Sequence, residues 1–270
     1  MPRFAANLGY LFNDRPAIER FGAAKAVGFT AVELQFPYAD SAVAVRREID
    51  RHGLTMLGIN TPLGSETEMG LAGVPGRERD FVVHFGQALD YAVTIGATAI
   101  HCMAGTVPPQ SEAAGEKVFI ANLKRAADLA GEKGIGLLIE PINRRDRPGY
   151  LLHHPEQAAG IIAAVGQANV RLQFDFYHVQ IEAGDLMTRF ERHRAIIGHV
   201  QIAGVPSRAE PDEGEVNYPA IFAMLDRAPA PYAGHVGCEY RPRRGTEEGL
   251  GWARPFGLGS LSPLAGRGSG

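Results

Sequence analysis

The stretch GIGLLIEPINRRDRPGYLLHHPEQAAGIIAAVGQANVRLQFD, residues 134–175, contains one complete strand–helix–strand unit. An apolar β-like run at 136–140 is followed by a helical segment at 154–165, and a second β-like run spans 169–175. Gly134 lies two residues before the first run, at a position where a glycine commonly ends the preceding helix. Repetition of this helix–glycine–strand order predicts βα units and a parallel sheet.

The same alternation runs along most of the chain. Eight β-like runs with intervening helices match the count of a (β/α)8 TIM barrel in a single domain. An open doubly wound sheet is the rival fold, but it would more often carry a glycine-rich loop after the first strand, and NLGYLFNDRP (7–16) holds one glycine. The expected strands are 4–7, 30–33, 54–60, 97–101, 136–140, 169–175, 196–201 and 235–239. The expected helices are 17–27, 41–52, 77–95, 111–133, 154–165, 179–194 (divisible around Gly184), 218–228 and 246–252.

The composition is that of a packed globular protein. The 270 residues are 45% hydrophobic and 21% charged, and 27 Lys and Arg against 30 Asp and Glu give a formal charge of −3, so no basic excess indicates a nucleic-acid partner. No apolar run approaches the roughly 18 residues of a membrane span, and the first apolar run breaks at Asn7, before it could form a signal-peptide core. Cys102 and Cys238 are too few for a disulfide framework. We therefore expect a cytoplasmic protein with no membrane or nucleic-acid partner.

A polar residue ends every expected strand. In a (β/α)8 barrel the carboxyl ends of the strands converge on one mouth, and active sites lie there. Polarity also resumes wherever a strand stops, so the set carries more weight than any single position. The eight residues are Asn7, Glu33, Asn60, His101, Glu140, Asp175, Gln201 and Glu239.

Four of these residues form a candidate metal site, namely Glu140, Asp175, Gln201 and Glu239. Three carboxylates brought together repel one another unless a cation or a proton compensates their charge. All four side chains offer oxygen, which suits Mg²⁺ or Mn²⁺, whereas zinc usually takes His or Cys. Two glutamates on well-separated strands could then move a proton between neighbouring carbons of a substrate whose enediolate oxygens the metal holds. This pattern favours aldose–ketose isomerisation or epimerisation of a sugar-like molecule.

The chain resembles the hydroxypyruvate isomerase family of xylose-isomerase-like TIM barrels, which includes 2-oxo-tetronate isomerases. The resemblance covers about residues 1–252, and its most specific block is GHVQIAGVPSRAEPDEGEVNY at 198–218. The other segments that carry it are FAANLGYLF (4–12), AVELQFPY (31–38), LLIEPIN (137–143), LQFDFYHVQ (172–180) and VGCEYRP (236–242).

This resemblance implies a metal site on Glu140, Asp175, Gln201 and Glu239, with Glu140 and Glu239 as the proton-transferring pair. Related sugar epimerases have a His as the third ligand, so Gln201 favours the hydroxypyruvate isomerase branch. The implied reaction interconverts hydroxypyruvate and tartronate semialdehyde, or isomerises a similar short 2-oxo acid such as 2-oxo-tetronate. The implied partner is thus a small oxo or hydroxy acid, and self-association into a homo-oligomer stays open.

Further polar residues fit such a substrate. His178, three residues after Asp175, could hydrogen-bond a substrate oxygen, and His101 could line the pocket. Arg208 could hold the substrate carboxylate in a fork geometry, with Glu210 orienting the Arg208 guanidinium. Two other functions stay open at this point: a metal-dependent AP endonuclease on the same fold, and a barrel that binds sugar acids without turning them over.

The last residues depart from the barrel pattern. In PFGLGSLSPLAGRGSG (255–270), 10 of 16 residues are Gly, Pro or Ser, and no helical periodicity is visible. We therefore expect a barrel domain at 1–252, a short eighth helix at 246–252, and an irregular tail at 253–270 that contributes nothing to the chemistry.

Overall fold

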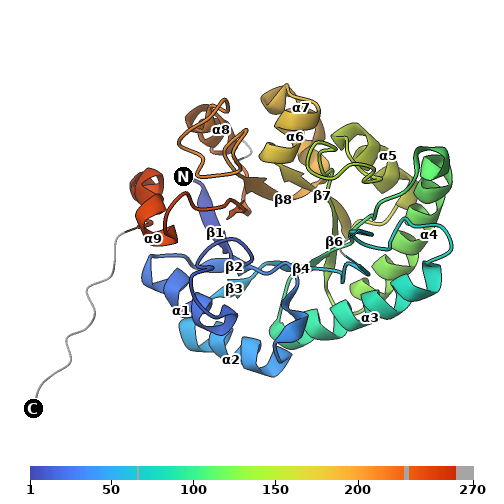
Figure 1. Ribbon diagram of the computed structural model, residues 1–270, viewed down its shortest axis with the longest axis horizontal. Coiled ribbons are helices and arrows are strands. Elements are labelled where there is room, and N and C mark those ends of the chain that lie inside the picture. Colours follow the sequence, from blue (N-terminus) through green and yellow to red (C-terminus); the bar gives the residue numbers. More distant parts are fainter. Residues whose placement is uncertain (66, 228–230, 260–270) are drawn as a thin grey trace, which may run out of the picture.

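The computed structural model of the chain describes residues 1–65, 67–227 and 231–259. All strand pairs of its single sheet are parallel, in the order β3-β2-β1-β9-β8-β7-β6-β5-β4, and the sheet curls into a nearly closed barrel (Figure 1). The predicted (β/α)8 barrel fold and its single domain are confirmed. The strands are β1 (Arg3–Asn7), β2 (Ala31–Glu33), β3 (Thr55–Met56), β4 (Gly58–Asn60), β5 (Ala99–His101), β6 (Gly136–Ile139), β7 (Val170–Asp175), β8 (Ile197–Ile202) and β9 (His235–Cys238).

The third predicted strand, 54–60, is divided into two short strands that together close the barrel. β3 pairs with β2, whereas β4 pairs with β5, so the chain changes partner around Leu57. Backbone hydrogen bonds continue through this change, because Leu57 N–H donates to Val32 O at 2.9 Å. The nine observed strands therefore occupy the eight strand positions of the predicted barrel.

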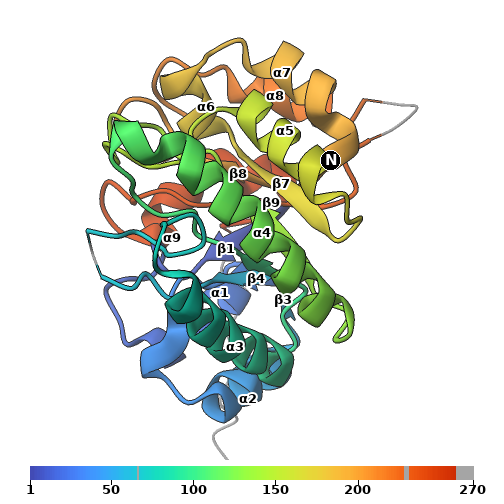
Figure 2. The ribbon, with the colours of Figure 1, turned by 90° about the vertical axis from the view of Figure 1, so that its right-hand side faces the viewer.

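Helices surround the strands on the outside of the barrel (Figures 1 and 2). The predicted helix 179–194 is indeed two helices, separated at Gly184, but the first of them starts at Phe176, directly after β7. No helix in the described part of the chain is both long and apolar enough to cross a membrane. The helices are α1 (Ala17–Ala26), α2 (Ala42–His52), α3 (Glu78–Ile95), α4 (Glu112–Gly131), α5 (Pro155–Val165), α6 (Phe176–Glu182), α7 (Leu186–His193), α8 (Tyr218–Leu225) and α9 (Thr246–Gly249).

Glycines end several helices, as the sequence predicted. Gly53 after α2 and Gly96 after α3 have φ angles of 57° and 72°, in the left-handed region that is costly for residues with a Cβ. Each of these turns sends the chain back towards the barrel wall. Alternate strand residues and the inner helix faces then bury one continuous apolar core.

The C-terminal closure of the barrel extends further than predicted. After α9, a 3-10 helix runs from Leu250 to Phe256, past the expected boundary at residue 252. The Phe256 ring packs 5.2 Å from that of Phe4, Leu258 is buried, and Gly259 N–H donates to Val27 O at 3.0 Å. Residues 253–259 therefore pack against the barrel, and the part of the expected tail at 260–270 lies outside the described residues.

Candidate active site

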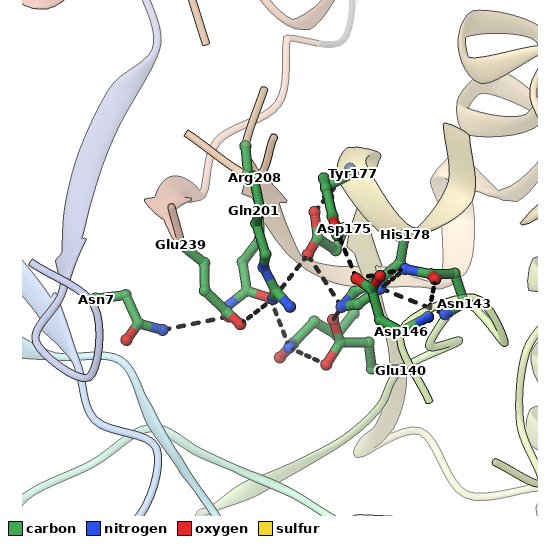
Figure 3. A network of polar contacts seen from close by, with 12 residues as sticks. Asn7, Glu140, Asn143, Asp146, Asp175, Tyr177, His178, Gln201, Arg208 and Glu239 are labelled. Atoms are coloured by element: carbon green, nitrogen blue, oxygen red, sulfur yellow. Dashed lines mark hydrogen bonds and ion pairs between the residues drawn. The ribbon is translucent and has the colours of Figure 1, made fainter. Parts of the chain in front are cut away.

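The four predicted metal ligands lie together at the carboxyl ends of four neighbouring strands (Figure 3). Asp175 ends β7 and pairs in register with Gln201 on β8, while Glu140 and Glu239 directly follow β6 and β9. All four side chains are buried, at 5% exposure or less. The parallel barrel brings them together because it aligns all the strands in one direction.

Two carboxylate oxygens in this cluster have no hydrogen-bond donor among the described residues. They are Glu140 Oε1 and Asp175 Oδ2, both fully buried. Asp175 Oδ1, by contrast, accepts from Tyr177 N–H at 2.9 Å and so caps α6. Buried polar atoms without a partner are rare in proteins and require an explanation such as an ion. The two free oxygens fit a divalent cation, because such cations prefer carboxylate ligands.

Crowding of acidic groups shifts the pKa values in the cluster. Burial, reinforced by the charges of Glu239 and Asp175, raises the pKa of Glu140 well above its ordinary value. Burial raises the pKa of Asp175 to about 6. Burial also raises the pKa of Glu239 to about 8, against the lowering effect of Arg208. Without a cation, the cluster therefore holds protons that a metal would displace.

His178 is held as a hydrogen-bond donor towards the cluster. Its Nε2 lies 3.7 Å from Asp175 Oδ2 and 3.9 Å from Glu140 Oε1. Burial lowers the pKa of His178 well below its ordinary value, so the ring is neutral at pH 7. Its Nδ1 accepts from the backbone N–H of Asn143 at 3.3 Å, which places the single ring proton on Nε2. Although His178 is close enough to join a metal site with Glu140 and Asp175, this tautomer suits donation to a substrate oxygen instead of ligation.

Arg208 covers the site and contacts Glu239. Its Nη2 donates to Glu239 Oε1 at 2.7 Å and lies 4.0 Å from Asp175 Oδ2. The guanidinium lies between the rings of Tyr10 and Tyr177, at 5.0 and 4.8 Å from their centroids. These two rings fix the guanidinium plane at the mouth of the barrel.

Glu210 does not orient Arg208, which corrects the prediction from the sequence. Its carboxylate instead accepts from Arg243 Nε at 2.8 Å and from the Arg243 backbone N–H at 3.2 Å. The chain between 204 and 209 turns so that Glu210 points towards the segment after β9, since Gly204 N–H donates to Ala209 O. Arg208 is instead held by the rings of Tyr10 and Tyr177 and by the carboxylate of Glu239.

His101 lies beside Glu140 and lines a small cavity next to the cluster, so its role in substrate binding stays a prediction. Its Nδ1 is 3.5 Å from Glu140 Oε2, and within the described residues neither ring nitrogen makes a hydrogen bond. Burial lowers the pKa of His101 to about 3, so the ring is neutral. A neutral imidazole with both nitrogens free can donate to or accept from a bound molecule.

Several polar residues that contact the cluster were missed by sequence reasoning. Gln173 Nε2 donates both to Glu140 Oε2 at 2.9 Å and to Gln201 Oε1 at 2.7 Å. Gln173 precedes Asp175 by two residues and His199 precedes Gln201 by two, and residues two apart share one face of a strand. This spacing is the signal that could have found them. The missed residues around the cluster are Tyr10, Gln35, Asn143, Gln173, Tyr177 and His199, whereas Asn7 and Glu33 were expected at the mouth as strand-end residues.

A pocket of about 290 Å³ opens above the cluster. Its polar lining includes Glu140, Glu239, His178, Arg208 and Arg147, and Met103 belongs to its apolar wall. A pocket of this size suits a small metabolite. The arrangement combines a candidate cation site, two acid–base candidates and two positive side chains, Arg147 and Arg208, in a small volume.

Comparison with known proteins agrees with this geometry. Residues 21–256 match the family model described as xylose isomerase-like TIM barrel. The chain is 48% identical to the 2-oxo-tetronate isomerase of Cupriavidus necator over 259 residues, which cover 95% of this chain and 99% of that protein. It is 38% identical to the hydroxypyruvate isomerase of Escherichia coli strain K12 over 259 residues, covering 95% of this chain and 100% of that protein.

A solved structure is also closely similar. The crystal structure of AP endonuclease, family 2 from Brucella melitensis superposes with a TM-score of 0.91 at 43% sequence identity, covering 95% of this chain and 99% of that one. Both the family match and the curated relatives extend over nearly the whole barrel. The chain therefore belongs to the xylose isomerase-like TIM barrel family and is an isomerase.

Proposed function

We propose that the protein is a metal-dependent isomerase of short 2-oxo acids that carry a hydroxyl group on C3. It would move the carbonyl group between C2 and C3 of 2-oxo-tetronate or of hydroxypyruvate. One observation carries the proposal: Glu140 and Asp175 present unpartnered buried oxygens in a carboxylate cluster that also contains Glu239. Such a cluster provides both a place for a cation and two bases.

The substrate carboxylate would bind Arg208. The guanidinium lies at the pocket wall between two tyrosine rings, and it offers the planar fork that carboxylates prefer. In the free protein Arg208 Nη2 donates a hydrogen bond to Glu239 Oε1 at 2.7 Å. A substrate carboxylate on Arg208 would compete for it and release Glu239 for proton transfer.

The cation would be held by Glu140, Asp175, Gln201 and Glu239. When bound, Mg²⁺ or Mn²⁺ supplies positive charge that stabilises oxyanions of the substrate. His178 would add its Nε2 proton as a hydrogen bond to a substrate oxygen, since Asn143 occupies Nδ1.

Proton transfer would use Glu140 and Glu239. One carboxylate removes the proton from C3, the C–H electrons form a C2–C3 double bond, and the C2 carbonyl electrons move onto the C2 oxygen. The other carboxylate then donates a proton to C2, while the C3 hydroxyl passes its proton to the C2 oxygen and becomes the new carbonyl. Exchange with solvent returns both carboxyl groups to their starting state. Burial raises the pKa of both carboxyl groups in the metal-free protein, and a bound cation would lower it again, which favours their action as bases.

Of the two substrates, the comparisons favour 2-oxo-tetronate. Relatives with that name are 39–48% identical to the chain, and relatives named hydroxypyruvate isomerase or putative hydroxypyruvate isomerase are 38–43% identical. The pocket of about 290 Å³ has room for either acid. The ratio of kcat/KM for 2-oxo-tetronate to kcat/KM for hydroxypyruvate is therefore the measurement that decides between them.

The test is turnover of both acids with Mg²⁺, with Mn²⁺ and after chelation, in D₂O. We expect metal-dependent isomerisation and incorporation of solvent deuterium at the carbon that receives the proton. A rate that chelation leaves unchanged would contradict the metal assignment. Tight binding of the acids without turnover would indicate a binding protein instead of an enzyme.

A second candidate function has one observation in its favour, the similarity to the AP endonuclease structure from Brucella melitensis. Duplex DNA with an AP site, incubated with the protein and Zn²⁺ or Mn²⁺, tests it directly. Cleavage together with salt-dependent DNA binding would establish this activity. We expect neither, because the chain carries a formal charge of −3 and a DNA-binding face requires a basic patch.

A further inference from the structure

Glu33 ends β2 and is buried beside the carboxylate cluster, and three side chains donate to it. His199 Nε2 lies 2.8 Å from Glu33 Oε1, while Gln201 Nε2 donates to Glu33 Oε2 at 2.7 Å and Asn7 Nδ2 does so at 3.3 Å. Glu33 is 5% exposed. Convergence of three donors is the pattern of a structural carboxylate, since the charged form has only acceptor positions.

This contact determines which end of the Gln201 amide faces the cluster. An amide has one accepting end and one donating end, and a carboxylate can pair only with the donating end. The NH₂ group of Gln201 therefore stays on Glu33, and its Oε1 points away from Glu33. On that side Gln173 Nε2 links Gln201 Oε1, at 2.7 Å, to Glu140 Oε2, at 2.9 Å.

We propose that Glu33 is a positioning residue that fixes the Gln201 amide so that its oxygen, and not its NH₂ group, faces the cation site. A reversed amide would present a donor to the cation and could not bind it. This inference rests on the proposed metal-dependent function, and it concerns a residue that need not contact the cation or the substrate.

An independent observation supports the pairing of Glu33 with Gln201. Gly237 on β9 pairs in register with Gln201, and a Cβ at residue 237 would collide with Glu33 Oε1 and lie 2.9 Å from Gln201 Cγ. Any larger residue there would displace both side chains. The neighbouring strand thus leaves room for this contact, and His199 holds the other oxygen of Glu33 in place.

The test is Mn²⁺ affinity, measured by electron paramagnetic resonance of free Mn²⁺, with thermal unfolding of each metal-free variant as the structural control. Glu33→Leu removes the acceptor, and we expect a 10- to 100-fold rise in Kd, as is typical for the partners of metal ligands. Glu33→Gln should stay within about threefold of the wild type, because its amide oxygen can still accept from Gln201 while its NH₂ group faces the other tautomer of His199.

A double-mutant cycle separates positioning from a general structural role. In a Gln201→Leu background, Glu33→Leu should cause no further loss of Mn²⁺ affinity, because the amide that it orients is gone. An undiminished second loss would overturn the proposal, as would wild-type affinity in Glu33→Leu. If Glu33→Leu does not fold, Glu33→Asp replaces it, because this side chain keeps the charge but is shorter by one methylene. We then expect at least a fivefold rise in the Kd for Mn²⁺, and unchanged affinity would overturn the proposal.

The wild-type protein distinguishes this inference from the proposed function. If it binds Mn²⁺ but turns over neither acid, the substrate assignment fails while the affinities above still decide the role of Glu33. If it binds no Mn²⁺, the metal site and the positioning role are both wrong.

Discussion

The two halves of the barrel mouth use buried glutamates in opposite ways, and Glu33 and Glu140 show the contrast. Both lie at the carboxyl ends of strands, and their exposed fractions are 5% and 4%. Glu33 receives three donors, whereas Glu140 Oε1 receives none among the described residues. Burial alone therefore does not mark a functional carboxylate. The supply of donors separates a carboxylate that holds the structure from one that is free to bind a ligand.

The difference arises from the neighbouring strands. Glu33 faces His199, Gln201 and Asn7, which all carry N–H groups. Glu140 faces other acids, and their charges contribute to its raised pKa. A cation at the second half of the mouth would supply the positive charge that these side chains lack.

The largest expected effect compares the same substitution in both halves. Glu140→Gln should lower kcat by about 10²- to 10⁴-fold, because it removes an acid–base group and a carboxylate ligand. Glu33→Gln should lower kcat by less than about tenfold, because its oxygen still accepts from Gln201. The measurement is turnover of 2-oxo-tetronate at saturating Mn²⁺. A similar fall in kcat in the two variants would show that Glu33 and Glu140 do not differ in function.

The second prediction concerns the pH dependence of stability. The ordinary pKa values of Asp175 and Glu239 are 3.8 and 4.5, and folding raises them to about 6 and about 8. At a pH between the unfolded and the folded pKa of each group, the folded state binds more protons than the unfolded state. The free energy of unfolding therefore falls as pH rises from about 5 to 8, by up to roughly 1.4 kcal/mol per pH unit for each titrating group. Thermal unfolding in chelator should show this decline, and saturating Mn²⁺ should remove most of it. A flat profile in chelator would contradict the crowding of acids.

A smaller effect is expected at Glu210, which resembles Glu33 in having a full set of donors. Glu210→Gln weakens the contact with Arg243, whose side chain is 35% exposed, so we expect a loss of roughly 1–2 kcal/mol in the free energy of unfolding. Its kcat on 2-oxo-tetronate should stay within about twofold of the wild type. Urea unfolding together with steady-state kinetics measures both. A large fall in kcat without loss of stability would return Glu210 to the active site.

The smallest effect is expected from removing residues 260–270. The contacts described for the C-terminal segment, those of Phe256, Leu258 and Gly259, would be kept, so stability should change by less than about 0.5 kcal/mol and turnover should be unchanged. Truncation after Trp252 is the matched control, and it should destabilise the barrel because it exposes Phe4 and Phe222. An inactive protein lacking only 260–270 would show that the mouth depends on that segment.

Local patterns predicted the elements and the residues at strand ends, but not the partners of those residues. The spacing of Asp175 and His178 placed both at the mouth, yet the tautomer of His178 depends on Asn143, which is 35 residues away in the sequence. Arg208 was expected near the substrate, but its contact with Glu239 and the two flanking tyrosines joins distant segments. Glu210 was assigned to a neighbour in sequence, whereas its partner Arg243 is 33 residues away.

Local sequence patterns were enough to predict the barrel and to select the four residues of the candidate cation site. Strand and helix periodicity are local, and a parallel barrel sends every strand end to one mouth, so a polar residue at a strand end can be placed without knowing its neighbours. The folded chain was needed to see which carboxylates have hydrogen-bond donors, which way the Gln201 amide points, and that the barrel packing continues to Gly259. The physical reason is that hydrogen bonding and pKa depend on distances of a few ångströms between segments far apart in the chain, and these distances exist only after the barrel has closed.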